Sequence, residues 1–294
     1  MKIGIDLGGS HIAVGVISPE GKILSKIEKD ISFIDLKKDN IEILIRDTMV
    51  SLINNVLKQL EIPIFIIEEI GIGIPGIIEN NIIKKCEKFD LKNVDLAKEI
   101  EEYYGVKVKL RNDAECALLA EYTYGNLQNI KNAVFLCLGT GIGGGMVLDN
   151  KLYHSEFGHM IIQKQGRECH CKNTGCFETY CSMRAFKKGI IEMLNLNENI
   201  SSEEILKILK KEVNNKEIDN YIDSYTEDLI VGLSNIINTI HPEVICFGGS
   251  FIHFQDILYK RLLEKIQLHS FQFEKPKLIL AKLQNDAGII GATL

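Results

Sequence analysis

The sequence lacks the features that mark membrane, secreted and nucleic-acid-binding proteins. Its net charge is −6 and its isoelectric point is near 5.7, so it offers no basic surface for nucleic acid. Its longest apolar stretch, 133–148, is interrupted by five glycines and is no membrane span. An acid at position 6 excludes the apolar core of a signal peptide. These absences predict a cytoplasmic protein with neither a membrane nor a nucleic-acid partner.

The remaining composition is that of a globular protein with a sizeable core. Hydrophobic residues make up 46% and charged residues 25% of the 294 positions. A chain of this length forms two domains, or one domain split by a cleft. The acidic balance does not exclude anionic ligands, because backbone amides bind phosphate without any net positive charge.

Cysteine, in contrast, is abundant, and three of the eight cysteines gather near one histidine. His159, Cys169, Cys171 and Cys176 lie within eighteen residues. Three thiols and an imidazole suit a tetrahedral Zn²⁺ with no open position, so we predict a structural zinc. A loop with incidental cysteines is the alternative. The other cysteines are expected to be core thiols, with Cys181 the ambiguous one.

The same stretch carries groups suited to a sugar. Glu156 and Glu178 border the loop, and with His159 they would line one small, acceptor-rich cavity. Such a lining suits a polyhydroxylated ligand. His170 is a rival metal ligand, but a residue between two cysteine ligands normally points away from the ion.

Along the chain, one strand–glycine turn–strand pattern occurs twice. Strands are expected at 2–6, 12–17 and 23–29, and the pattern returns at 133–138 and 143–148. An opening β-meander excludes the usual Rossmann order, which begins βαβ. The repeat implies two similar α/β halves facing each other across a cleft.

Apolar spacing and turn residues predict the remaining elements. We expect helices with a buried face from Ile45 to Leu60, then at 95–104, 114–124, 225–239 and 254–266, and a short one after Asp286. Further strands are expected at 64–74, 106–110, 244–247 and 277–281.

Two glycine-rich turns occupy equivalent places in the repeat. The first contains Asp6, Gly8, Gly9 and Ser10, and the second contains Gly139, Thr140, Gly141, Gly143 and Gly144. Small residues let backbone amides approach an anion, and hydroxyls add donors. A phosphate chain clamped between two hairpins is the prediction, with Asp6 helping to hold Mg²⁺. Neither turn is a Walker loop, since G-K-[ST] is absent.

Asp113 follows a predicted strand, in the run R-N-D-A-E. Its ordinary role would be to cap the next helix, a role that Asn112 can also take. A carboxylate at the end of a strand can equally accept the proton of a substrate hydroxyl, as phosphoryl transfer requires.

Together these motifs resemble the ROK family of sugar kinases, which have the actin/hexokinase-like ATPase fold. The resemblance covers nearly the whole chain and rests on D-L-G-G-S at 6–10, G-I-G-I-P-G at 71–76, N-D at 112–113, G-T-G-I-G-G-G at 139–145, E-F-G-H at 156–159, C-x-C-x4-C at 169–176 with Glu178, G-G at 248–249, and D-A-G-x-x-G-A at 286–292. It departs at Ser10 and His11, where Thr and Lys are usual, at Ser155 and at Lys172, which replaces a glycine.

The resemblance implies a role for each matching residue. Asp113 would be the catalytic base, and Asn112, Glu156, His159 and Glu178 would bind the sugar. His159 and the three cysteines would bind zinc. Asp6, the two glycine turns and the pair Gly248 and Gly249 would handle ATP and Mg²⁺.

The expected function is ATP-dependent phosphorylation of a hexose at its 6-hydroxyl, in a duplicated α/β fold with two domains around a cleft. We expect domains at 1–115 plus 285–294 and at 116–284, and a homodimer or a dimer of dimers. Glucose is the first acceptor to test, then N-acetylmannosamine or N-acetylglucosamine. ROK-like repressors carry a helix-turn-helix before the sugar domain; with the first strand expected at 2–6, we expect none in this chain. A sugar-binding module without catalysis is the other alternative.

Overall fold

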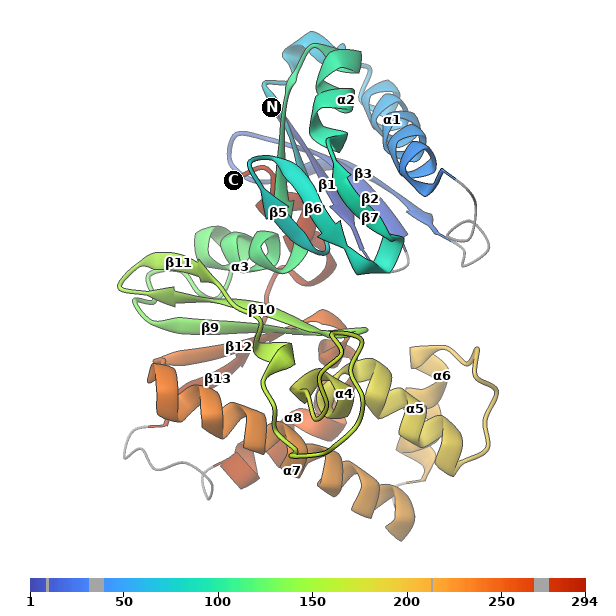
Figure 1. The fold of residues 1–294 in the computed structure, drawn as a ribbon, viewed down its shortest axis with the longest axis vertical. Coiled ribbons are helices and arrows are strands. Elements are labelled where there is room, and N and C mark those ends of the chain that lie inside the picture. The colour runs from blue at the N-terminus through green and yellow to red at the C-terminus, as the bar shows by residue number, and fades with distance from the viewer. Residues whose placement is uncertain (9–10, 32–39, 213, 267–274) are drawn as a thin grey trace. The chain divides into compact units, whose positions relative to one another are not determined.

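The computed structural model describes residues 1–294 except 9–10, 32–39, 213 and 267–274 (Figure 1). The chain divides into two units. Unit 1 comprises Met1–Gly125 and Asn285–Leu294, and unit 2 comprises Asn126–Gln284. The expected bounds of 115 and 116 fall inside a helix, α3 (Asp113–Tyr124). The observed division keeps α3 whole in unit 1, where it packs against α9 (Ala287–Ala292).

Each unit is built on a five-stranded sheet of the same topology. In unit 1 the order is β3-β2-β1-β4-β8, from β1 (Lys2–Leu7), β2 (His11–Ile17), β3 (Ile23–Asp30), β4 (Glu69–Ile74) and β8 (Lys107–Asn112). In unit 2 the order is β11-β10-β9-β12-β13, from β9 (Ala133–Leu138), β10 (Ile142–Leu148), β11 (Lys151–His154), β12 (Val244–Gly248) and β13 (Lys277–Leu280). Both sheets join an antiparallel meander to two parallel strands. The expected duplication is therefore confirmed.

The two faces of the unit 1 sheet are covered by different helices. Ile3 and Ile5 of β1 are fully buried in the core that α1 (Ile41–Gln59) and α2 (Leu96–Tyr104) help to form. Gly4 points to the other face, since side chains alternate along a strand. A Cβ at Gly4 would lie 1.9 Å from the backbone oxygen of Ile289, so this glycine lets α9 rest directly on the sheet.

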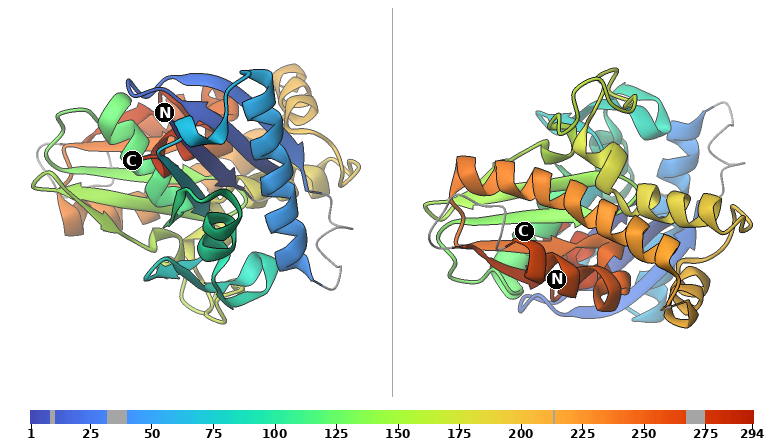
Figure 2. Two further views of the ribbon diagram at one scale, coloured as in Figure 1. Left: turned by 90° about the horizontal axis from the view of Figure 1, so that it is seen from above. Right: turned by 90° about the horizontal axis from the view of Figure 1, so that it is seen from below.

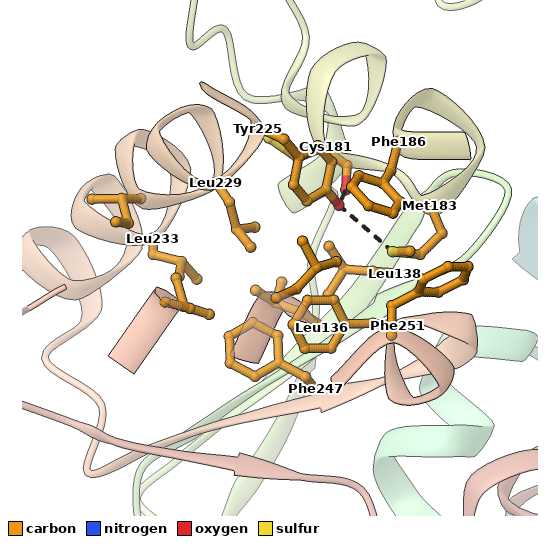
Figure 3. Packing of buried hydrophobic residues seen from close by; sticks show 14 of the residues in the cluster. Leu136, Leu138, Cys181, Met183, Phe186, Tyr225, Leu229, Leu233, Phe247 and Phe251 are labelled. Atoms are coloured by element: carbon orange, nitrogen blue, oxygen red, sulfur yellow. Dashed lines mark hydrogen bonds between the residues drawn. The ribbon is translucent and has the colours of Figure 1, made fainter. Parts of the chain in front are cut away.

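The core of unit 2 holds the helix that carries Glu178. Helices α4 (Phe177–Cys181), α5 (Met183–Met193), α6 (Ser202–Lys211), α7 (Lys216–Ile240) and α8 (Gln255–Ile266) contribute to it. The longest, α7, packs against both α4 and α8 (Figure 2). Tyr225 of α7 donates a hydrogen bond of 2.7 Å to the backbone oxygen of Cys181 (Figure 3). The C-terminal end of α4 is thereby fixed to α7.

Between residues 64 and 94, one expected strand starts later than predicted and one sheet was not predicted. The strand expected at 64–74 begins only at Glu69, because Ile64–Ile66 form a 3-10 turn in which Phe65 is 83% exposed. An unexpected second sheet of three strands follows, made of β5 (Ile77–Glu79), β6 (Ile82–Cys86) and β7 (Leu91–Val94). Asn80 and Asn81 join β5 to β6 with positive φ angles of 51° and 64°. Asparagine tolerates this left-handed backbone, which two-residue hairpin turns require.

In the part of the chain that the structure describes, none of the helices combines the length and the apolar character needed to span a bilayer.

Candidate active site

The structure brings the four expected metal ligands together. One ligand atom from each of His159, Cys169, Cys171 and Cys176 lies within 4.8 Å of the others. The Sγ atoms of Cys171 and Cys176 are 3.6 Å apart, and Cys169 Sγ is 3.7 Å from His159 Nδ1. Zn–S bonds of about 2.3 Å and Zn–N bonds of about 2.0 Å at tetrahedral angles separate two sulfurs by about 3.8 Å and sulfur from nitrogen by about 3.5 Å. The donor set and its spacing therefore fit a tetrahedral ion.

Local backbone geometry brings these ligands round. Isolated β-bridges pair Ile161 with Cys176 and Glu168 with Thr174, so the loop doubles back on itself. Gly175 has a φ of 83°, and a Cβ there would lie 1.8 Å from a backbone oxygen of Gln163. This close approach requires glycine. Lys172, which stands where the family commonly has glycine, has a φ of 72°.

The pKa values of the three thiols differ because their surroundings differ. Burial raises the pKa of Cys169 well above its usual value. Burial, together with the hydrogen bond that the Cys176 thiol donates to Cys171, raises the pKa of Cys176. For Cys171, the effect of burial is outweighed by hydrogen bonds from the Asn173 amide and the Cys176 thiol, which leave its pKa lowered. A metal ion binds thiolates, so metal binding would displace protons from this cluster.

Glu178 is the most enclosed of the expected sugar ligands, with a side chain that is 9% exposed. It lies in the first turn of α4, whose residues Phe177 and Cys181 are also buried. Its Oε1 is 3.9 Å from His159 Nδ1, so these two expected sugar ligands lie side by side. Its Oε2 accepts a hydrogen bond of 3.4 Å from the backbone amide of Ile142. Glu178 therefore links the cysteine loop to the second glycine turn.

His170 does not point away from the cluster, contrary to the expectation for a residue between two metal ligands. Its Nδ1 is 2.9 Å from Glu178 Oε1 and 3.8 Å from Cys169 Sγ. His159, His170 and Glu178 form a second group with metal-ligating potential. The position of His170 beside a cysteine ligand was the only sequence signal for a role in this cluster. Its contact with Glu178 depends on the orientation of its side chain, which sequence spacing does not define.

Glu156 has a different partner. Its Oε1 lies 2.9 Å from Nε2 of His154, at the end of β11, and its side chain is 58% exposed. His154 was not predicted from the sequence. Between them, Ser155 has a buried hydroxyl without a hydrogen-bond partner among the described residues.

In unit 2 the second glycine turn lies beside Gly248 and Gly249. Gly249 has a φ of 71°, and a Cβ there would lie 2.6 Å from the backbone oxygen of Leu138. The turn comprises fewer residues than expected. The backbone amide of Gly139 donates to the backbone oxygen of Gly141 at 2.9 Å, and Thr140 is exposed between them. Gly143 and Gly144 belong to β10 instead. They are paired with Cys137 and Leu136 of β9.

In unit 1, Asp6 lies at the end of β1 beside α9. A Cβ at Gly288 would lie 2.5 Å from Asp6 Oδ2. Burial and the nearby charge of Asp113 raise the pKa of Asp6 to about 7. The Gly8 amide donates to the backbone oxygen of His11 at 2.9 Å and so closes the hairpin. Gly9 and Ser10, the other expected phosphate-binding residues, lie outside the described residues.

Asn112 and Asp113 share the start of α3. Asn112 Oδ1 accepts hydrogen bonds from the amides of Ala114 at 2.9 Å and Glu115 at 3.3 Å, and its side-chain amide donates to the Gly76 oxygen at 3.1 Å. Asn112 is therefore the helix N-cap. Asp113 Oδ1 also accepts from the Ala114 amide, at 2.9 Å.

A family model described as the ROK family matches residues 2–294. The chain belongs to the ROK family. Among ROK relatives, it is 30% identical to the glucokinase of Thermotoga maritima, over 99% of this chain and 95% of that protein. It is 28% identical to the N-acetyl-D-glucosamine kinase of Photobacterium profundum, over 99% and 98% of the two chains.

ROK relatives also include regulators. The xylose repressor of Caldicellulosiruptor bescii is 27% identical, over 98% of this chain and 76% of that protein. Among solved structures, a ROK glucokinase from Streptomyces griseus, in complex with glucose and AMPPNP, superposes with a TM-score of 0.81 at 23% identity, over 99% and 97% of the chains. This likeness confirms the expected actin/hexokinase-like fold. The kinase relatives agree with the expected enzyme class, an ATP-dependent sugar kinase.

Proposed function

We propose that this chain transfers the γ-phosphate of ATP to the 6-hydroxyl of a hexose. Glucose is the leading acceptor, because the glucokinase of Thermotoga maritima is 30% identical to this chain. N-acetylglucosamine and N-acetylmannosamine are the alternatives. The observation that carries the proposal is the pairing of His159 with Glu178 beside a Cys3His cluster. That arrangement supports a polar sugar site held by a structural ion.

In this proposal Glu156, His159 and Glu178 grip ring hydroxyls of the sugar. Carboxylates accept hydrogen bonds from hydroxyls, and an imidazole can donate or accept, so the set suits vicinal diols. His159 and the three cysteines would hold a zinc ion, which contributes to folding and not to chemistry because all four of its positions are taken by protein.

Asp113 is the proposed general base. It takes the proton of the 6-hydroxyl as that oxygen bonds to the γ-phosphorus, and the bond to the ADP oxygen breaks. Asn112, fixed by its three hydrogen bonds, would hold both Asp113 and the sugar in place. Mg²⁺, when bound, supplies the charge that neutralises the phosphates, and Asp6 is its proposed partner.

Donors for the phosphates are proposed from the glycine turns. Thr140, exposed at the tip of the second turn, would donate its hydroxyl. Gly139 and Gly8 use their own amides within the turns, so their part is to keep the backbone close to the ligand. Gly248 and Gly249 would border the nucleoside, beside Leu138.

An acceptor panel tests the proposal directly. ADP release would be measured with glucose, N-acetylglucosamine, N-acetylmannosamine, mannose and xylose, each as kcat/KM, with Asp113→Asn as the blank. We expect one hexose to exceed the others by at least about tenfold, as a few hydroxyl contacts allow. Sugar binding by calorimetry without any ATP turnover would instead assign the chain to the regulatory branch of the family.

A further inference from the structure

His170 has a contact that the proposed chemistry leaves unused. Its Nδ1 lies 2.9 Å from Glu178 Oε1. The same oxygen accepts from Cys169 Sγ at 3.2 Å, while Oε2 accepts from the Ile142 amide at 3.4 Å. A carboxylate as enclosed as Glu178 needs donors to remain charged. Three groups therefore determine how it is oriented.

Metal binding would change this set of donors. A cysteine ligates zinc as a thiolate, so Cys169 would lose the proton that it donates to Oε1. Its thiolate sulfur and the carboxylate oxygen, 3.2 Å apart, would then both be hydrogen-bond acceptors, and the hydrogen bond between them would be lost. The remaining contacts are the long one from Ile142 and the short one from His170. Because an ionised carboxylate only accepts, the ring N–H of His170 is the donor in the short contact.

We propose that His170 is a positioning residue for Glu178: its N–H holds the carboxylate in the orientation that meets the sugar. This inference rests on the proposed function. His170 follows Cys169 directly, so an ion that fixes the cysteine also fixes the backbone of the histidine. Its side chain is 53% exposed, which makes it replaceable without opening the core.

Two variants separate the donor from the bulk of the ring. His170→Leu removes the N–H at similar size, whereas His170→Asn places an amide donor close to the position of Nδ1. Sugar affinity would be measured by calorimetry and by KM, together with the KM for ATP and the zinc content. We expect His170→Leu to raise the Kd and KM for sugar by about 10- to 100-fold, as loss of a hydrogen bond to a charged group does. The KM for ATP and the zinc content should stay within about twofold of wild type.

His170→Asn should recover sugar affinity to within about threefold of wild type. Unchanged sugar affinity in His170→Leu would overturn the proposal. Equal weakening of sugar affinity in both variants would also overturn it, because the effect would then come from packing of the ring. Loss of zinc together with sugar affinity would overturn it as well, because His170 would then act at the metal. Measurements on the wild-type chain distinguish failure of this inference from failure of the proposed function. If the wild-type chain neither binds nor phosphorylates any sugar of the panel, the proposed function is wrong, and this inference is wrong with it.

Discussion

At the residue scale, two neighbouring carboxylates of unit 1 are set apart by their surroundings. Burial and the charge of Asp113 raise the pKa of Asp6. Asp113 lies at the start of α3, where Asn112 provides the N-cap. Groups whose environments differ in this way are suited to different roles. A metal-facing acid and a proton-accepting base are the pair that phosphoryl transfer needs.

Replacing Asp113 by asparagine should abolish phosphoryl transfer and preserve sugar binding. Loss of a general base costs about 10²- to 10⁴-fold in rate, and more where the group also aligns the nucleophile. The helix should persist because Asn112 keeps its two cap bonds. The measurements are kcat, sugar Kd by calorimetry and the thermal midpoint. A variant that keeps more than half of the wild-type kcat would remove Asp113 from this role.

Asp6 should make the metal-free protein less stable as the pH rises. Its carboxyl holds a proton up to about pH 7 in the folded chain, against a usual pKa of 3.8. Between those values the folded state binds more protons at Asp6 than the unfolded state does. The contribution of Asp6 to stability is therefore largest below pH 3.8 and is lost as the pH rises through 7. Asp6→Asn stays neutral and removes this loss.

The test of this titration is urea unfolding of both proteins without Mg²⁺. From about pH 5.5 to about pH 8, the stability of Asp6→Asn relative to wild type should increase by about 2 kcal/mol. Groups that do not interact with Asp6 titrate alike in both proteins, so the difference between the proteins isolates Asp6 and its coupling to Asp113. A constant difference across this range would mean that Asp6 is ionised throughout.

At the element scale, sequence patterns predicted most strands but did not predict the features that depend on contacts between distant parts of the chain. The meander, α1 and the cysteine loop follow from short-range spacing, which the sequence contains. The strands β5, β6 and β7 are too short for a periodic signal, although Asn80 and Asn81 mark their turn. The observed division follows α3, which belongs to unit 1 through its packing on α9, an element distant in sequence. The orientation of His170 depends on a tertiary contact with Glu178.

The packing of α9 on the sheet should depend on glycine at Gly71. A Cβ there would lie 1.7 Å from the backbone oxygen of Ala292, so Gly71→Ala must displace α9 or the strand. We expect a loss of about 1–3 kcal/mol in unfolding free energy, the usual cost of overpacking a core. Gly139→Ala is the matched control, because no atom lies within 4 Å of the added carbon. Equal stability of the two variants would contradict this account of α9.

The cysteine loop should hold one zinc ion per chain. Metal analysis of purified, tag-free protein should find it, and Cys171→Ser should release it by removing one of the four ligands. Metal loss should weaken sugar binding, because the same loop presents Glu156 and leads into Glu178. Full zinc content in a protein with Cys169, Cys171 and Cys176 all replaced by serine would exclude these thiols as ligands.

At the scale of the whole molecule, the proposed reaction draws on both units. Asp6 and Asp113 belong to unit 1, and Glu156, His159 and Glu178 belong to unit 2. Each unit has its own sheet and its own buried core. The xylose repressor of Caldicellulosiruptor bescii aligns with 98% of this chain, so family membership alone does not decide between catalysis and regulation. Turnover, and the identity of its product, decides it.

The product should be a hexose 6-phosphate. In the proposal, three side chains of unit 2 bind ring hydroxyls, while Asp113 of unit 1 receives the proton of the attacking group. The exocyclic primary alcohol is the least hindered hydroxyl of a hexose and can extend toward a base that the ring hydroxyls do not reach. Proton-coupled ³¹P NMR distinguishes the outcomes, since a 6-phosphate couples to two methylene protons and a 1-phosphate to one anomeric proton. An anomeric pattern would reverse the orientation of the sugar, and Asp113 would then face the end of the ring that we assign to Glu156, His159 and Glu178.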